Sequence, residues 1–121
     1  MAGNRSDVVA IVDDDHGVRK SLKFLLETFG HKVTTFASAA AFLADRALRP
    51  ACLLVDHHMP QMTGIELAAL LLAEGTGIPL LLMTGAPSPA ILSRAARLGV
   101  EAVLAKPLDE DELLKFIRLH V

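Results

Sequence analysis

Five short apolar runs alternate along the chain with longer stretches in which apolar residues recur every three or four positions. The short runs have the length of β-strands, whereas the longer stretches have the period of amphipathic helices. The expected strands cover residues 8–12, 32–36, 52–55, 78–83 and 100–105. Strict alternation of strand and helix implies a parallel sheet with right-handed crossovers. The sequence therefore predicts one α/β domain over residues 8–121, preceded by a polar lead over residues 1–7.

Five helices are expected between and after these strands. The first has its apolar positions from residue 18 to residue 29 and is ended by Gly30, and the third covers residues 65–73. The second and the fourth are expected to end near residues 46 and 98. The predicted N-caps are Ser38, Ser88 with Pro89 in the first turn, and Asp109, which with Glu112 three residues later resembles a capping box.

Composition fits a sheet that is covered on both faces and narrows the class of function. About half of the residues are hydrophobic, but there are five Phe and no Trp or Tyr, so the core has to be largely aliphatic. A net charge of -2 gives no basis for direct nucleic-acid binding. The single cysteine, Cys52, excludes an internal disulfide and a multi-cysteine metal site. Glycine, proline and glutamate interrupt the longest apolar region, so no membrane span and a cytoplasmic location are expected.

Polar side chains follow four of the predicted strands at the point where each strand ends. They are Asp13, Asp14 and Asp15 after the first strand, Asp56 after the third, Thr84 after the fourth and Lys106 after the fifth. Ligands of open α/β sheets bind beyond the carboxyl ends of the strands, so we expect these groups to share one rim. Any one of them alone would be an ordinary cap, turn former or solvated charge, and Asp15 is assigned to capping the first helix.

The predicted set of carboxylates, hydroxyl and ammonium suits phosphoryl transfer. Crowded carboxylates repel one another, and a hard divalent cation relieves that repulsion; Mg²⁺ is the expected ion, with Mn²⁺ as an alternative. Phosphoryl transfer needs mainly positioning and charge neutralisation, which a lysine and a threonine can also supply. An aspartate can itself act as the nucleophile and form an acyl phosphate.

Four motifs occur in order with spacing that identifies a family. The chain reads IVDDD at residues 11–15, VDHHMP at 55–60 with Gly64, MTG at 83–85 and AKP at 105–107. Together they resemble the receiver domain of response regulators in two-component signalling, over essentially the whole chain. The Thr-Gly pair and the RKSL at residues 19–22 resemble most closely the branch of nitrogen-fixation regulators. The resemblance implies a flavodoxin-like three-layer sandwich whose five parallel strands lie in the order 2-1-3-4-5.

The resemblance also assigns roles at the rim. Asp56 would be the phosphoacceptor, receiving the phosphoryl group from a sensor histidine kinase or a phosphotransfer protein as an aspartyl phosphate. Asp14 would ligate Mg²⁺ directly and Asp13 through water, with Asp56 and the main-chain carbonyl of His58 as further ligands. The domain would act as a signalling switch within a two-component or phosphorelay pathway, with slow autodephosphorylation, and would not be a metabolic enzyme.

Three further positions bear on the switch. Thr84 would bond a phosphoryl oxygen, Lys106 would pair with the phosphoryl group, and the peptide bond before Pro107 would be cis. The family carries an aromatic residue three positions before the lysine, where this chain has Val103. The usual coupling between threonine and aromatic ring is therefore in question, and the output is expected to pass through the loop 85–88 or through a weaker surface change. Homodimer or effector contacts are expected on the surface of the fourth helix and fifth strand, residues 89–105.

Two other classes of protein share parts of this pattern. A Mg²⁺-dependent phosphohydrolase with an aspartyl-phosphate intermediate would need a second acid just after the nucleophile, where this chain has His58. A flavin-binding electron carrier would need aromatic stacking residues that the chain lacks. Zinc at His57 and His58 is disfavoured because the spacing offers no further ligands. His58 is instead expected to affect how long the phosphate survives, since it lies two positions after Asp56.

Overall fold

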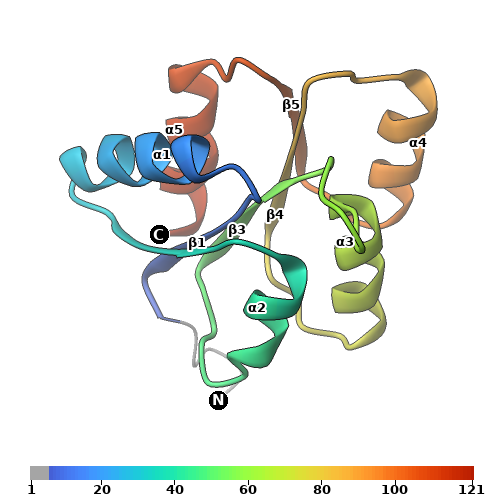
Figure 1. Ribbon diagram of the computed structural model, residues 1–121, viewed down its shortest axis with the longest axis horizontal. Helices are drawn as coiled ribbons and strands as arrows, with labels where there is room; N and C mark the ends of the chain where they lie inside the picture. Colours follow the sequence, from blue (N-terminus) through green and yellow to red (C-terminus); the bar gives the residue numbers. More distant parts are fainter. Residues whose placement is uncertain (1–5) are drawn as a thin grey trace.

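The computed structural model describes residues 6–121, in which five strands and five helices alternate (Figure 1). The strands are β1 (Val8–Val12), β2 (Lys32–Phe36), β3 (Cys52–Asp56), β4 (Leu80–Thr84) and β5 (Ala102–Ala105). The helices are α1 (His16–Thr28), α2 (Ala39–Ala44), α3 (Gly64–Ala73), α4 (Pro89–Arg97) and α5 (Glu110–His120). Most of the predicted lead, residues 1–5, lies outside the described residues.

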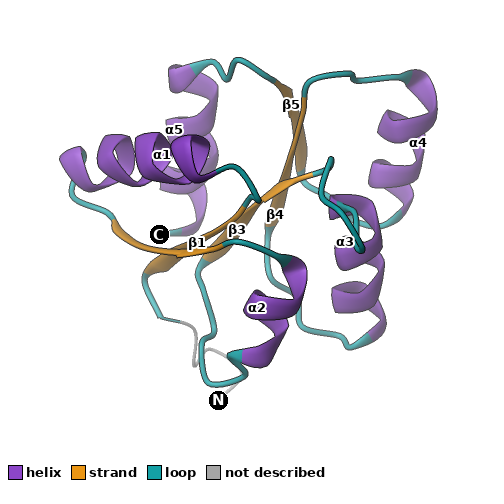
Figure 2. Ribbon diagram, in the orientation of Figure 1, coloured by secondary structure: helices purple, strands orange, loops and turns teal. Residues whose placement is uncertain are grey.

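The strands form one parallel sheet in the order β2-β1-β3-β4-β5, which confirms the predicted topology (Figure 2). β1 and β3 lie in the interior of the sheet, and every residue of β3 and β4 is buried. Strands covered on both faces need continuous apolar runs, which the sequence supplies. β2 is the more polar strand and lies at an edge, as its composition predicts.

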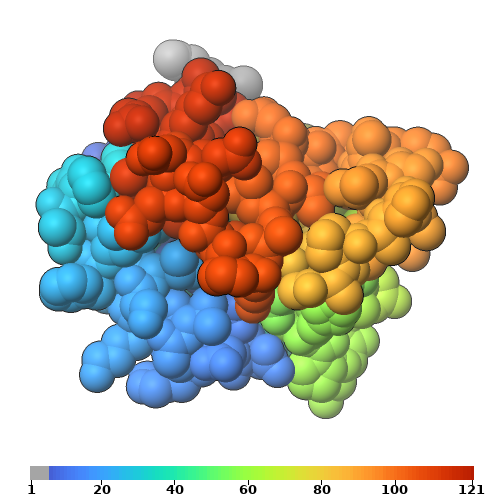
Figure 3. Space-filling model, turned by 90° about the horizontal axis from the view of Figure 1, so that it is seen from above, coloured from blue at the N-terminus to red at the C-terminus, as the bar shows by residue number. Residues whose placement is uncertain are grey.

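Two hydrophobic clusters pack on opposite faces of the sheet. On one face, side chains of α1 and α5 such as Leu26 and Ile117 contact inward-facing strand residues such as Leu54. On the other face, α2, α3 and α4 cover the sheet through residues such as Phe42 and Leu67. Figure 1 shows the resulting three layers, with α1 and α5 on one side of the sheet. Seen from above, the segment after β5 lies between α1 and the α4 segment (Figure 3).

The predicted caps determine where most helices begin. The side chains of Asp15, Ser38 and Ser88 accept hydrogen bonds from backbone N–H groups in the first turns of α1, α2 and α4. Asp109 caps α5 by accepting from the N–H groups of Asp111 and Glu112. A full reciprocal capping box occurs instead at α3, between Thr63 and Glu66, where none was predicted.

Three strands have boundaries that differ from the prediction. β3 extends by one residue to Asp56, and β4 and β5 both begin later than predicted. β4 begins at Leu80, two residues later than predicted, because Gly77 has a positive φ of 67° and Pro79 has no N–H to donate. It also includes Thr84 as its last residue. β5 begins at Ala102, because the N–H of Val100 still bonds the carbonyl of Ala95 at the end of α4.

α2 is also shorter than predicted. α2 ends at Ala44 rather than near residue 46, and Asp45 starts a turn in which its carboxylate accepts the Leu48 N–H.

Cys52 is fully buried in the centre of the sheet, and burial raises the pKa of its thiol to about 12. Within residues 6–121, no helix is long and apolar enough to cross a membrane.

Candidate active site

The parallel register brings the predicted polar residues to one edge of the sheet. Val12 pairs with Val55, so Asp13 and Asp56 follow directly on neighbouring strands. Asp56 pairs with Met83, and Thr84 pairs with Ala105, which places Thr84 and Lys106 at the same level. The structure thus collects on one rim the groups that the sequence places at four separate strand ends.

Three carboxylates form a cluster at this rim. Asp13, Asp14 and Asp56 each offer an oxygen that lies within 4.8 Å of the other two. Asp13 and Asp56 are 0% and 4% exposed, whereas Asp14 is exposed. The cluster therefore has a buried base and one side open to water. Oxygen donors of this kind fit a hard cation such as Mg²⁺, which keeps water among its ligands.

Lys106 bridges the two buried acids. Its Nζ lies 3.1 Å from Asp13 Oδ2 and 3.1 Å from Asp56 Oδ1. Burial lowers the pKa of the Lys106 ammonium, but the bonds to Asp56 and Asp13 outweigh it, so the pKa is raised above its usual value. Burial raises the pKa of Asp13, and repulsion from Asp56 adds to this, against the opposing bonds from the Asp15 N–H and Lys106. The lysine thus holds a positive charge between two crowded acids.

The acidic loop between β1 and α1 is fixed by its own hydrogen bonds. Asp13 Oδ1 accepts the Asp15 N–H at 2.9 Å, and Asp15 Oδ1 accepts the Val18 N–H at 3.1 Å. Asp15 therefore caps α1, as predicted. The Arg19 guanidinium reaches back from α1 and donates to the Asp13 carbonyl at 2.7 Å. This last contact was not predicted, because it depends on how the loop folds back on the helix.

The Thr84 hydroxyl shares a hydrogen bond with a histidine, and this contact was not predicted from the sequence. His58 Nε2 lies 3.0 Å from Thr84 Oγ1, and the same oxygen accepts the Ala86 N–H at 3.1 Å. His57 points elsewhere, and its Nδ1 accepts the Ile65 N–H at 3.4 Å. The two rings meet edge to face, with centroids 5.0 Å apart. Burial and the neighbouring His58 lower the pKa of His57.

The remaining predicted positions lie on or beside β5. Val103 pairs with Leu82, is partly buried and packs against the cluster beneath α2, α3 and α4. The Lys106–Pro107 peptide bond is cis. The Lys106 N–H donates to the Thr84 carbonyl, which ties the end of β5 to the end of β4.

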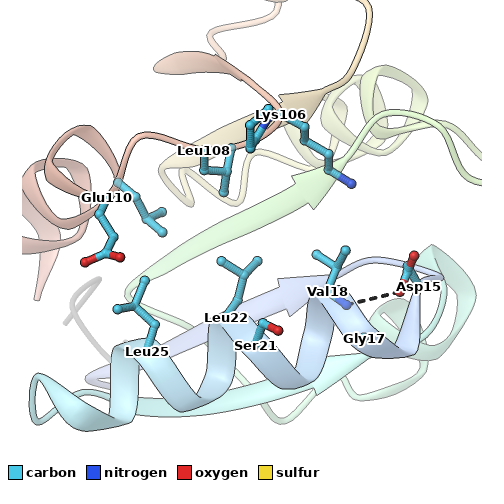
Figure 4. A pocket seen from close by; sticks show the side chains of 11 residues that line it. Asp15, Gly17, Val18, Ser21, Leu22, Leu25, Lys106, Leu108 and Glu110 are labelled. Atoms are coloured by element: carbon cyan, nitrogen blue, oxygen red, sulfur yellow. Dashed lines mark hydrogen bonds between the residues drawn. The ribbon is translucent and has the colours of Figure 1, made fainter.

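A groove of about 740 Å³ adjoins the rim, between α1 and the segment that leads into α5. Figure 4 shows Val18, Leu22 and Leu25 pointing from α1 toward Leu108 on the opposite wall. The Lys106 side chain extends past the end of this groove toward the acidic cluster. The groove is therefore apolar along its middle, with Lys106 and Asp15 at the end nearest Asp56 and Glu110 at the other end.

Comparison with known proteins decides what kind of domain carries this site. Residues 9–118 match the response regulator receiver domain. The chain belongs to this family. It is a receiver domain of a two-component response regulator, and the predicted resemblance is confirmed.

Related sequences support the predicted branch of receiver domains. The FixJ transcriptional regulatory protein of Azorhizobium caulinodans is 40% identical over 111 residues, which are 91% of this chain and 53% of the relative. The response regulator protein TmoT of Ectopseudomonas mendocina is 34% identical over 116 residues, 95% of this chain and 53% of the relative. The likeness to nitrogen-fixation regulators is therefore confirmed. The chain spans about half the length of these curated relatives.

Solved receiver domains share the fold over nearly the whole chain. A crystal structure called FixJ-N superposes with a TM-score of 0.84 at 33% identity, covering 94% of this chain and 92% of that one. The chemotaxis protein CheY4 of Vibrio cholerae superposes with a TM-score of 0.85 at 27% identity, covering 94% and 98% of the two chains. The predicted flavodoxin-like architecture of the receiver domain is confirmed.

Proposed function

We propose that Asp56 accepts a phosphoryl group from the phosphohistidine of a sensor kinase or phosphotransfer protein, in a Mg²⁺-dependent reaction. The observation that carries the proposal is Lys106, whose ammonium lies 3.1 Å from a carboxylate oxygen of Asp56 and 3.1 Å from one of Asp13. A cation at this place offsets charge on a nucleophilic carboxylate while leaving its other oxygen free. The domain then relays the signal as a cytoplasmic switch.

In the proposed transfer, a carboxylate oxygen of Asp56 attacks phosphorus. The bond from phosphorus to the donor nitrogen breaks, and its electron pair stays on the departing imidazole. Asp13, Asp14, Asp56 and the main-chain carbonyl of His58 would hold the divalent ion, Mg²⁺ or Mn²⁺. When bound, that ion neutralises phosphoryl oxygens and brings donor and acceptor together.

The other rim residues act after the new bond has formed. Lys106 pairs with a phosphoryl oxygen, and the Thr84 hydroxyl donates a hydrogen bond to another. Interactions that exist only in the phosphorylated domain shift the population toward a second conformation. Slow hydrolysis of the aspartyl phosphate by water then resets the switch. The proposed receiver unit covers residues 8–121, after the lead 1–7.

Two surfaces are proposed for partners. A protein donor has to bring its phosphohistidine to the open side of the acidic cluster, and the groove beside α1 ends there. Its apolar walls and its position next to Lys106 support donor docking along α1. The surface of α4 and β5, residues 89–105, is proposed for contacts with an output partner or a second copy.

The acceptor is tested with acetyl phosphate and Mg²⁺, followed by intact mass. The wild type should gain one phosphoryl group, and the gain should disappear with chelator and in Asp56→Asn. Asp45→Asn, an exposed acid after α2, serves as the matched control and should behave as wild type. A folded wild type that gains no mass, or an Asp56→Asn variant that gains it, would contradict the proposal. Loss of the added mass over time measures autodephosphorylation.

A further inference from the structure

The hydroxyl of Thr84 is fully buried and has two partners. It accepts the Ala86 N–H at 3.1 Å and shares a hydrogen bond of 3.0 Å with His58 Nε2. A hydroxyl has one proton and two lone pairs, so these contacts occupy most of its bonding capacity. Thr84 is therefore held in its present orientation by one backbone group and one side chain.

The His58 ring connects this buried hydroxyl to the surface. His58 lies in the loop between β3 and α3 and is exposed, whereas Thr84 ends β4 beneath it. Val103, by contrast, sits in β5 and packs into the hydrophobic cluster. Its short apolar side chain cannot hydrogen-bond the hydroxyl. Among residues 6–121, His58 is the residue whose side chain hydrogen-bonds Thr84.

We propose that His58 is a positioning residue of the switch and takes the part that an aromatic ring at position 103 would play. When Thr84 turns its hydroxyl toward a phosphoryl oxygen on Asp56, the bond to His58 breaks and the ring is released. The change then emerges at the β3–α3 loop rather than on β5. This inference rests on the function proposed above and specifies how phosphorylation is read out.

The proposed coupling has a limited size. A neutral hydrogen bond contributes about 1 kcal/mol net, which corresponds to roughly a fivefold change in an equilibrium. His58→Ala should therefore shift the balance between the two orientations of Thr84 about fivefold toward the phosphoryl-binding one. Modest coupling of this kind suits a switch whose main driving force is the phosphoryl group itself.

The first test uses unphosphorylated protein and follows the ring nitrogens of His58 by ¹⁵N NMR at fixed pH. Thr84→Val keeps the shape of the side chain but removes the hydroxyl, so the His58 Nε2 signal should move. The signals of His31, which lies beyond the end of α1, should stay fixed. Thr28→Val, an exposed change on α1, is the matched control and should leave His58 unaffected. An unchanged Nε2 signal in Thr84→Val would overturn the proposal.

The second test adds acetyl phosphate and Mg²⁺ and measures mass and NMR on the same sample. In phosphorylated wild type, the His58 Nε2 signal should move toward its value in Thr84→Val, while the Val103 methyl signals stay nearly fixed. Phosphorylated protein with an unchanged His58 ring, or with a change confined to Val103, overturns the proposed readout but leaves Asp56 as acceptor. Protein that gains no mass refutes the proposed function and with it the readout. In that case the comparison with Thr84→Val in unphosphorylated protein still shows whether the hydrogen bond between His58 and Thr84 exists.

Discussion

Asp13 is the residue at which the needs of the site oppose the stability of the fold. Its carboxylate is 0% exposed and lies close to Asp56, and burial followed by that repulsion raises its pKa. Lys106 offsets part of this through the bond of 3.1 Å. A buried acid with a raised pKa costs stability whenever it is ionised. The site therefore keeps a charge that folding alone would not select.

Asp13→Asn should stabilise the metal-free protein and weaken Mg²⁺ binding. Asn keeps the oxygen that accepts the Asp15 N–H but carries no charge. Because the folded-state pKa of Asp13 is raised, its ionisation increasingly opposes folding as the pH rises from the ordinary pKa to the folded-state pKa, and the effect is complete above the latter. We expect the free energy of unfolding at pH 7 with chelator to rise above the wild-type value. Urea unfolding measures it.

The pH dependence and a neighbouring acid provide the controls. The advantage of Asp13→Asn should vanish as the pH falls below the ordinary aspartate pKa of about 4, where the wild-type carboxyl is protonated in both states. Asp14→Asn removes an exposed member of the same cluster. It should weaken Mg²⁺ binding with little change in metal-free stability. Equal stability of wild type and Asp13→Asn at pH 7 would contradict the prediction.

At the residue scale, the polar side chains at the ends of the strands could be predicted from the sequence, but the contacts between loops could not. Asp13, Asp56, Thr84 and Lys106 come together because parallel strands end at one edge, and this follows from the apolar runs alone. The bond from His58 to Thr84 depends on the path of the β3–α3 loop, in which Gln61 adopts a positive φ of 71°. No local pattern predicts such a path.

At the element scale, the start of α3 packs directly under the β3–α3 loop. A Cβ added to Gly64 would lie 2.8 Å from the Asp56 carbonyl oxygen, 3.0 Å from His57 Cα and 2.5 Å from Leu82 Cδ1. Two of these are backbone atoms, which cannot move aside as a flexible side chain can. The close approach of α3 to the end of β3, which carries Asp56, therefore requires glycine at residue 64.

Gly64→Ala should destabilise the protein by about 1–3 kcal/mol, as overpacking of a closely packed site does. Gly85→Ala is the matched control, because a Cβ at Gly85 would meet no atom within 4 Å and its φ is not positive. It should cost little. Thermal unfolding of the two variants measures the difference. A stability of Gly64→Ala equal to that of Gly85→Ala would show that α3 can shift without cost.

Ser21→Arg tests α1 as the wall against which the donor docks. Ser21 is exposed and lines the groove, so a large cation there should obstruct a protein donor. It should leave phosphorylation by acetyl phosphate unchanged, because that donor needs only the acidic cluster. We expect at least about a tenfold loss of transfer from a phosphohistidine protein, since about 1.4 kcal/mol lost from a complex corresponds to that factor. Radiolabel transfer assays measure it.

The same substitution on another helix controls for added charge. Ser93→Arg places an arginine on the exposed surface of α4, away from the groove. Its transfer rates from both donors should match the wild type. If Ser21→Arg slows acetyl phosphate and the protein donor alike, the effect lies in the acidic cluster rather than in docking.

Element boundaries divide into those set by local chemistry and those set by tertiary pairing. The start of α4 at Pro89 follows from Ser88 and the fixed φ of proline, and the sequence predicts it correctly. Val100 reads as a strand residue because it is β-branched and apolar. Its N–H nevertheless bonds the end of α4, and this pairing decides the boundary. Local propensity cannot anticipate it.

At the scale of the whole molecule, the acidic cluster links ion binding to folding. An unfolded chain does not hold Asp13, Asp14 and Asp56 within 4.8 Å of one another, so an ion that needs all three binds the folded state. Mg²⁺ at about 100 times its dissociation constant should therefore add about 2.7 kcal/mol to the free energy of unfolding. Urea titrations with and without MgCl₂, at matched ionic strength in NaCl, measure the gain.

The Asp56→Asn variant shows whether the gain comes from this cluster. Removing one of the three carboxylates should reduce the stabilisation by Mg²⁺ and leave any general effect of salt. A gain of equal size in wild type and Asp56→Asn would place the ion elsewhere.

The buried thiol at the centre of the sheet can report when the hydrophobic core opens. Cys52 is the single cysteine of the chain, is fully buried and has its pKa raised to about 12 by burial. A thiol reagent can therefore react only when β3 is exposed, and a thiolate forms readily only then. Because the Cys52 side chain packs on the face of the sheet that α1 and α5 cover, that exposure requires these helices to move away from the sheet. The labelling rate in native buffer thus measures how often this helix layer opens, without denaturant.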